Sequence, residues 1–144
     1  MPNGLMFVDT NVWVARGVED HIFHQRAHDK LNFLLEQEDL LCTSNQIIRE
    51  LISVCSLGRG LSRPLTWDEL RQQIEALLAQ TIFLNESEAS TRRLIDLGAN
   101  YKVIGKQIHD TNIVATMLAH GITRLVTFNP NDFKRFSEIE IIIP

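Results

Sequence analysis

The sequence has little of what would place a chain in a membrane or in a disulfide-linked extracellular fold. No apolar stretch approaches the ~20 residues that cross a bilayer, and no charged segment typical of a signal peptide precedes the first apolar run. The two cysteines, Cys42 and Cys55, lie in apolar segments, which predicts reduced, buried side chains. We therefore expect a cytoplasmic protein without membrane contact or disulfides.

Positive charge is also scarce. The formal net charge is −4 and the isoelectric point is about 5.7. This balance argues against a protein that coats duplex nucleic acid by charge alone, because phosphate backbones attract basic surfaces. A basic rim around a site is still compatible with an acidic total, since the field at a site depends on nearby charges. The candidates for such a rim are Arg16, Arg59, Arg63, Lys102, Lys106, Lys134 and Arg135.

What is present is the pattern of one α/β domain. The chain has 144 residues, 44% of them hydrophobic and 22% charged, which fits a single domain spanning residues 1–144. Apolar runs predict strands at 5–8, 40–43, 81–84, 124–128 and 139–143. Helical periodicity predicts helices within 11–38 (interrupted near Gly17), after a cap at Thr43 or Ser44, and over 66–80, 85–98 and 108–120. This alternation predicts a mostly parallel central sheet covered by helices on both faces.

Local signals mark several of the predicted helix ends. Thr66 with Glu69, and Asn85 with Glu88, have the spacing of a capping box at a helix start. Gly121 follows the 108–120 segment and is well placed to end it.

Three acidic residues stand where a functional site would form or where apolar residues are expected. Asp9 directly follows the first strand, and ligands of open α/β sheets bind at the carboxyl ends of strands; the alternative is that Asp9 only caps the next helix. Glu50 shares a helix face with apolar neighbours, although it could reach solvent from the edge of that face. Asp110 lies on the apolar face in the first helical turn, where it would also interact favourably with the helix dipole.

A fourth polar cluster, residues 127–133, follows a predicted strand and includes Thr127, Asn129 and Asp132. By itself it could be an ordinary Asn-Pro turn. Parallel topology, however, can bring all four clusters to one edge of the sheet. Clustered carboxylates repel one another, and all-oxygen ligation predicts Mg²⁺ or Mn²⁺ rather than zinc.

The ordered set of these motifs resembles the PIN domain family, and more narrowly the VapC-type toxins of bacterial toxin–antitoxin pairs. The resemblance is carried by Asp9-Thr10-Asn11 after an apolar strand, by Glu50, by the segment 109–116 that begins His-Asp-Thr-Asn, and by the segment 125–133. Order, spacing and length agree over essentially the whole chain.

The resemblance implies a PIN-like three-layer α/β/α fold and a Mg²⁺-dependent endoribonuclease, with Mn²⁺ as an alternative ion. It implies Asp9 and Asp110 as metal ligands, with Glu50 as a further acid and Thr127 as a positioning group. Many relatives have an acid where this chain has Asn129, so Asn129 and Asp132 compete for the fourth position and a second metal is in question. It also implies an RNA substrate, a cognate antitoxin whose C-terminal segment covers the site, and a homodimer.

Other functions remain alternatives. The Asn129 departure leaves open a catalytically inactive PIN-fold scaffold that binds RNA or protein as the alternative to the nuclease. A haloacid-dehalogenase-like phosphatase would require a second aspartate at position 11, where this chain has Asn11. His24 and His28 have helical zinc-ligand spacing, but Gln25 stands where that motif has its glutamate, so a solvated helix face is favoured.

Overall fold

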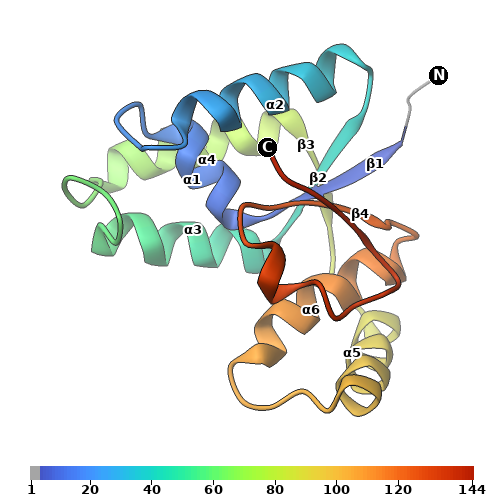
Figure 1. Ribbon diagram of the computed structural model, residues 1–144. Coiled ribbons are helices and arrows are strands. Elements are labelled where there is room, and N and C mark those ends of the chain that lie inside the picture. Colours follow the sequence, from blue (N-terminus) through green and yellow to red (C-terminus); the bar gives the residue numbers. More distant parts are fainter. Residues whose placement is uncertain (1–3) are drawn as a thin grey trace.

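The computed structural model describes residues 4–144, which form a three-layer α/β/α fold around a five-stranded, all-parallel sheet (Figure 1). The strands are β1 (Leu5–Val8), β2 (Leu40–Ser44), β3 (Thr81–Leu84), β4 (Arg124–Val126) and β5 (Glu140–Ile142). Their order across the sheet is β3-β2-β1-β4-β5. The central strands are short and almost wholly apolar because helices cover both of their faces.

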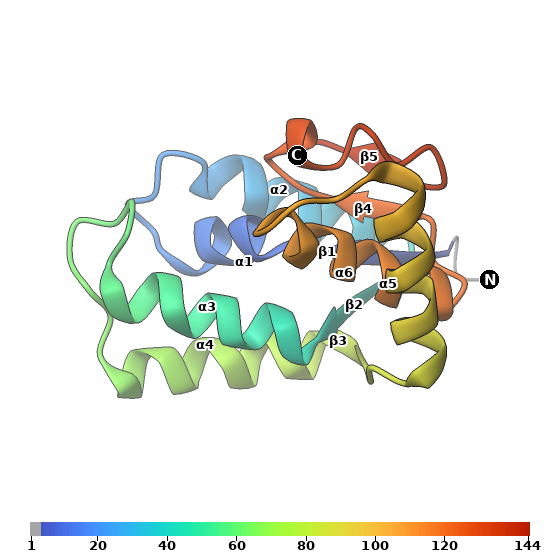
Figure 2. The ribbon, with the colours of Figure 1, turned by 90° about the horizontal axis from the view of Figure 1, so that it is seen from below.

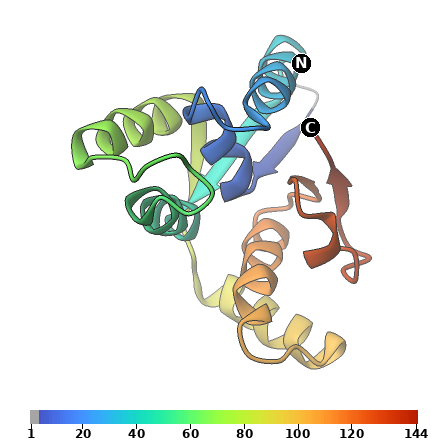
Figure 3. The same cartoon turned by 60° about the vertical axis from the view of Figure 1, so that its left-hand side comes forward.

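Within residues 4–144, six α-helices and one short 3₁₀ helix connect the strands. They are α1 (Thr10–Gly17), α2 (His24–Glu36), α3 (Asn45–Leu57), α4 (Trp67–Gln80), α5 (Glu88–Tyr101), α6 (Gln107–Ala119) and η1 (Pro130–Asp132). The chain moves outward from β1 to β2 to β3 and then crosses back to β4. Right-handed crossovers therefore place α1–α4 on one face and α5 and α6 on the other, as Figure 3 shows. None of the described helices is long and apolar enough to cross a membrane.

The reversal of strand order lies between β1 and β4, which are adjacent and parallel. Phe7 pairs with Leu125 and Val8 with Val126, so the two strands end side by side. The Asp9 N–H continues the ladder by donating to the Val126 carbonyl at 2.9 Å. In open α/β sheets the crevice at such a switch point is where ligands bind. Figure 2 shows the ends of α1, α3 and α6 gathered along this edge of the sheet.

The structure agrees with most of the expected elements and corrects one helix start. Thr66 and Glu69 form the predicted capping box. The box predicted for Asn85 and Glu88 is wrong, because Ser87 caps α5 and exchanges hydrogen bonds with Ser90 instead. Glu88 is consequently the first helical residue, where its side chain pairs with Arg92 in solvent.

The region after β4 also differs from expectation. The strand stops at Val126 rather than at residue 128, because the Phe128 N–H donates to the Asn11 side chain instead of to a neighbouring strand. The other four strands agree with their predicted ranges to within one residue at each end, and both cysteines are buried as free thiols.

Candidate functional site

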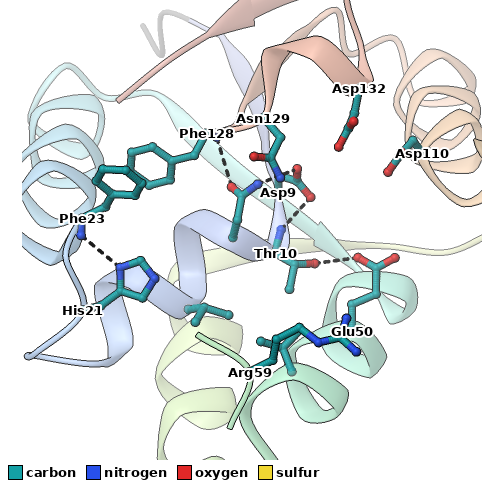
Figure 4. A pocket seen from close by; sticks show the side chains of 13 residues that line it. Asp9, Thr10, His21, Phe23, Glu50, Arg59, Asp110, Phe128, Asn129 and Asp132 are labelled. Carbon is teal, nitrogen blue, oxygen red and sulfur yellow. Dashed lines mark hydrogen bonds between the residues drawn. The ribbon is translucent and has the colours of Figure 1, made fainter. Parts of the chain in front are cut away.

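A cavity of about 440 Å³ lies at the switch point (Figure 4). It collects carboxylates that are far apart in the sequence: Asp9 follows β1, Glu50 comes from α3, Asp110 from α6 and Asp132 from η1. Asn129 also lines the cavity, whereas Thr127 lies beneath it, fully buried. The structure therefore brings together all six residues singled out in the sequence.

Asp9 is the most buried of these acids, at 7% exposure, and it is held by three donors. The N–H of Thr10, the first helical residue, donates to Oδ1 at 2.8 Å, so Asp9 caps α1. The Thr127 hydroxyl donates to Oδ2 at 2.8 Å, and the Asn11 side-chain amide donates to the same oxygen at 3.3 Å. Asp9 is thus both the cap of α1 and a rigidly placed carboxylate, so the two interpretations of this residue are compatible.

Glu50 is half-buried and is positioned by neighbours on two elements. Its Oε2 accepts from the Thr10 hydroxyl at 2.7 Å, and its Oε1 accepts from the Gln46 amide at 3.0 Å. Gln46 also donates to the His109 carbonyl at 2.7 Å and accepts from Asn112 at 2.7 Å. No local pattern singled out this buried glutamine, which links α3 to the start of α6 and holds Glu50 towards the cavity.

Two of the aspartates bind protons much more tightly than free carboxyl groups. Burial raises the pKa of Asp9 to about 6, against the opposing hydrogen bonds from Thr127 and Thr10. Burial also raises the pKa of Asp110 to about 7, and the charges of Asp132, Asp9 and Glu50 add to this effect. The positive charge of Arg135 acts in the opposite direction but does not cancel the rise in the pKa of Asp110. The site therefore concentrates negative charge that no buried cation among residues 4–144 neutralises.

Asn129 and Asp132 occupy different positions relative to this cluster. The Asn129 backbone N–H donates to the Thr127 hydroxyl at 3.0 Å. Asp132 lines both the main cavity and a smaller pocket that it shares with Asp110, and its charge acts on Asp110 more strongly than that of Asp9. Figure 4 shows the Asp132 and Asp110 carboxylates side by side and pointing towards Asp9.

The donor set fits a hard divalent cation. Within the described part of the chain, no three His, Cys, Asp or Glu side chains form a ready-made metal cage. Mg²⁺ does not require one, because it usually binds through one or two carboxylates and fills its other positions with water and substrate phosphate. Asp9 and Asp110 could supply those two carboxylates, and a cation there would stabilise the ionised forms that burial disfavours.

The opposite wall of the cavity is aromatic and was not anticipated as part of the site. It consists of His21 and Phe23, from the loop before α2, and Phe128. Position 128 lay in a selected motif, but nothing in the local pattern around residues 21–23 indicated that this loop would reach the site. Among the basic residues proposed as a rim, Arg59 lines the main cavity and Arg135 lines the pocket beside Asp110.

The histidines considered for zinc do not belong to this site. The His24 ring lies 3.0 Å from the Ala15 carbonyl through Nδ1, and His28 Nε2 lies 3.0 Å from the Asn32 side chain. Both rings are engaged within the layer formed by α1 and α2.

Solved structures of similar fold cover nearly the whole chain at low identity. VapBC2 from Rickettsia felis, bound to a DNA fragment from its promoter, gives a TM-score of 0.75 at 17% identity, over 97% of this chain and 98% of that one. VapC20 from Mycobacterium tuberculosis, described as a sarcin–ricin loop cleaving toxin, gives 0.69 at 15% identity, over 91% and 95%. VapBC-1 from nontypeable Haemophilus influenzae gives 0.70 at 18% identity, over 96% and 97%.

The sequence comparison is consistent with this likeness of fold. Among curated proteins, no sequence is significantly similar to this chain. The model of the PIN domain, however, matches residues 6–139, which include every strand end that lines the cavity. The chain therefore belongs to the PIN domain family.

Proposed function

We propose that this chain is a Mg²⁺-dependent endoribonuclease that hydrolyses RNA phosphodiester bonds and is the toxin of a type II toxin–antitoxin pair. The observation that carries the proposal is the pair Asp9 and Asp110, which share one cavity and have pKa values raised by burial and by neighbouring carboxylates. Such a pair is unfavourable in a purely structural role and favourable as a cation site.

Asp9 and Asp110 would hold the ion, which when bound polarises a phosphate oxygen and lowers the pKa of a coordinated water. Thr127 and Thr10 keep the Asp9 carboxylate in one orientation through their hydrogen bonds. Asp132, whose side chain is exposed and accepts no hydrogen bond from residues 4–144, is the acid best placed to accept a proton from the attacking water. We assign it the fourth acidic position, with Asn129 as a polar contact to the phosphate.

Glu50 has a different part in this scheme. Both of its oxygens already accept hydrogen bonds, so it helps to position Asp9 through Thr10, and the start of α6 that carries Asp110 through Gln46. Water attacks phosphorus while the bond to the 3′-oxygen breaks, and that oxygen leaves as a hydroxyl after taking up a proton from solvent. The products are a 5′-phosphate and a 3′-hydroxyl, because the nucleophile is water rather than a ribose 2′-hydroxyl.

Relatives of similar fold support the biological assignment. One is described as a toxin that cleaves the sarcin–ricin loop, and others were crystallised as VapBC complexes. By analogy we propose a small antitoxin as partner and a homodimer as the active assembly. PIN nucleases generally use a divalent metal, which agrees with the oxygen-rich donor set.

The test is RNA cleavage by the wild type and by Asp9→Asn and Asp110→Ala variants, with the ends of the products mapped. Each variant should lower the Mg²⁺-dependent rate by at least about 100-fold with the fold intact, since loss of one charge-stabilising group costs about that much. Asp96→Asn, an exposed carboxylate on α5, is the matched control and should cleave normally. Undiminished cleavage by Asp9→Asn would refute the assignment of the metal pair.

An inactive RNA- or protein-binding scaffold is the second candidate, because Asn129 replaces an acid that many relatives have. Metal titration separates the two functions. A rise in melting temperature with Mn²⁺ that Asp9→Asn abolishes supports the nuclease, whereas no change in the wild type supports the scaffold.

A further inference from the structure

The aromatic wall of the cavity has the geometry of a stacking surface. The rings of Phe23 and Phe128 lie 4.8 Å apart between centroids, with only 19° between their planes. The Arg26 guanidinium lies 5.0 Å from the first ring and 5.2 Å from the second, which adds a cation–π contact to both. Both rings are half-buried and line the cavity, so part of this flat apolar surface is open to a ligand.

His21 adds a directed polar group to the same wall. Its Nδ1 accepts a hydrogen bond from the Phe23 N–H at 3.0 Å, which leaves the ring proton on Nε2. Burial lowers the pKa of His21, so the imidazole is neutral at pH 7. No residue among 4–144 accepts a hydrogen bond from Nε2. In Figure 4 the ring lies below the Phe23–Phe128 pair, on the side of the cavity away from Asp110 and Asp132.

Hydrogen bonds link the aromatic wall to the carboxylates. The Phe128 N–H donates to the Asn11 Oδ1 at 3.1 Å, while the Asn11 amide donates to Asp9 Oδ2 at 3.3 Å. Phe128 also directly follows Thr127, which holds Asp9 from the other side. A nucleotide whose phosphate lies at the carboxylates therefore has the aromatic wall within the same cavity of about 440 Å³.

We propose that His21, Phe23 and Phe128 form a nucleobase subsite that stacks one unpaired base next to the phosphodiester at the carboxylates. The proposal rests on the proposed function, because it assumes that RNA occupies the cavity. A base supplies a flat π-face for the phenylalanines and an acceptor edge for the His21 donor. An apolar peptide side chain would cover the rings but leave that donor without a partner when water is excluded.

The subsite also predicts the form of the RNA. The face of a base inside a duplex is stacked on neighbouring bases, and its edge is paired with the opposite strand. Such a base cannot enter a recess and offer its face and its edge to the protein. Arg59, an exposed cation at the cavity with no ion pair to any residue in the described range, is available for a phosphate on the neighbouring nucleotide. The site is thus suited to a single-stranded loop rather than to a helix.

The experiment measures binding separately from cleavage, in the Asp9→Asn background with Mg²⁺ present. Fluorescence anisotropy follows short single-stranded oligoribonucleotides in which an abasic ribose replaces the base at each position in turn. One abasic position should weaken binding by roughly 5- to 100-fold, the range expected for loss of one stacked base. Phe128→Leu should weaken the intact RNA by at least about 5-fold and leave the affinity for that abasic RNA unchanged.

Two further variants distinguish a specific effect on the subsite from misfolding and from a general loss of RNA binding. His21→Ala should weaken intact RNA by roughly 2- to 10-fold through loss of one hydrogen bond, again without effect on the abasic RNA. Phe33→Leu is the matched control, because Phe33 lies on α2, is 51% exposed and is outside the cavity. It should bind both RNAs as the parent does.

The outcomes distinguish the subsite from the nuclease activity. If the wild type cleaves RNA but no abasic position alters binding, the subsite is refuted and the proposed function stands. If the wild type does not cleave but binding depends on one base and on Phe128, the subsite stands and the nuclease assignment falls. If the wild type neither cleaves RNA nor binds any of these oligoribonucleotides, both are refuted.

Discussion

Replacement of Asp9 by asparagine should stabilise the protein when no divalent cation is present. Asp9 is 7% exposed and forms no ion pair with any residue in the described part of the chain. Burial raises its pKa from 3.8 to about 6, even though hydrogen bonds from Thr127 and Thr10 act in the opposite direction. The folded protein therefore holds a charge at this position only at a cost in free energy.

The sign and size of the effect follow from linkage. Because the folded-state pKa is above the unfolded value, the folded state binds this proton more tightly, and ionisation of Asp9 lowers stability as pH rises from about 4 through 6. Above pH 7 the loss is complete and corresponds to roughly 3 kcal/mol. Asparagine has no such charge but gives up one acceptor oxygen, at a cost of about 1 kcal/mol. We expect a net gain of about 1–3 kcal/mol, or roughly 3–10 °C in Tm for a chain of this size.

The assay is thermal and urea unfolding in EDTA at several pH values between 4 and 8. The difference between Asp9→Asn and the wild type should be largest at pH 8 and should vanish or change sign near pH 4. Asp96→Asn, which removes an exposed carboxylate, should show no comparable pH-dependent difference. A variant that is less stable than the wild type at pH 8, or a difference independent of pH, would refute this account of the site.

Added Mg²⁺ should reverse the order of stability. A ligand that binds only the folded state stabilises it in proportion to the logarithm of its concentration over Kd. The wild-type Tm should therefore rise with Mg²⁺, and the Asp9→Asn Tm should not. Equal rises in both proteins would show that Asp9 is not a metal ligand, whatever its effect on stability.

Two predictions concern the scaffold that carries the site. Gly58→Ala should cost more stability than Gly60→Ala: both residues have positive φ (80° and 74°), but only at Gly58 would a Cβ meet backbone, 2.8 Å from the Pro64 nitrogen. By urea unfolding, we expect a loss of stability of about 1 kcal/mol for Gly60→Ala and 2 kcal/mol or more for Gly58→Ala. Equal losses would show that the contact with Pro64 does not affect stability. Thr66→Ala should cost about 1 kcal/mol through loss of the capping box with Glu69, and an unchanged unfolding midpoint would contradict that role.

Much of the secondary structure could be predicted from contiguous residues. The run at 5–8, the break near Gly17 and the cap at Thr66 are local properties of the chain, and the structure has all three. The error at the start of α5 is of the same local kind: Asn85 and Ser87 both suit a cap, and only the backbone decides which carbonyl begins the helix. The Asn85 carbonyl instead lies 2.9 Å from the His120 ring, a contact with the end of α6 that local pattern does not contain.

The acids of the candidate site could be selected from sequence because each departs from a local rule. Asp9 follows a buried strand, and Glu50 and Asp110 interrupt apolar helix faces, which is a recognisable signal without any knowledge of the fold. What the sequence could not decide was the choice between Asn129 and Asp132. That choice depends on how the side chains of η1 lie relative to α6. Only the fold brings these two segments together.

The carboxylate cluster therefore depends both on local sequence and on the fold. Contiguous residues specify the types of group available, a set of oxygen ligands at strand ends, and the period of the elements that carry them. The fold makes β1 and β4 neighbours, so that Thr127 donates to Asp9 across 118 residues of chain. It also decided that the loop of His21 and Phe23 lies against Phe128. Strand order and loop packing are set by the burial of the whole sheet, and no local pattern encodes them.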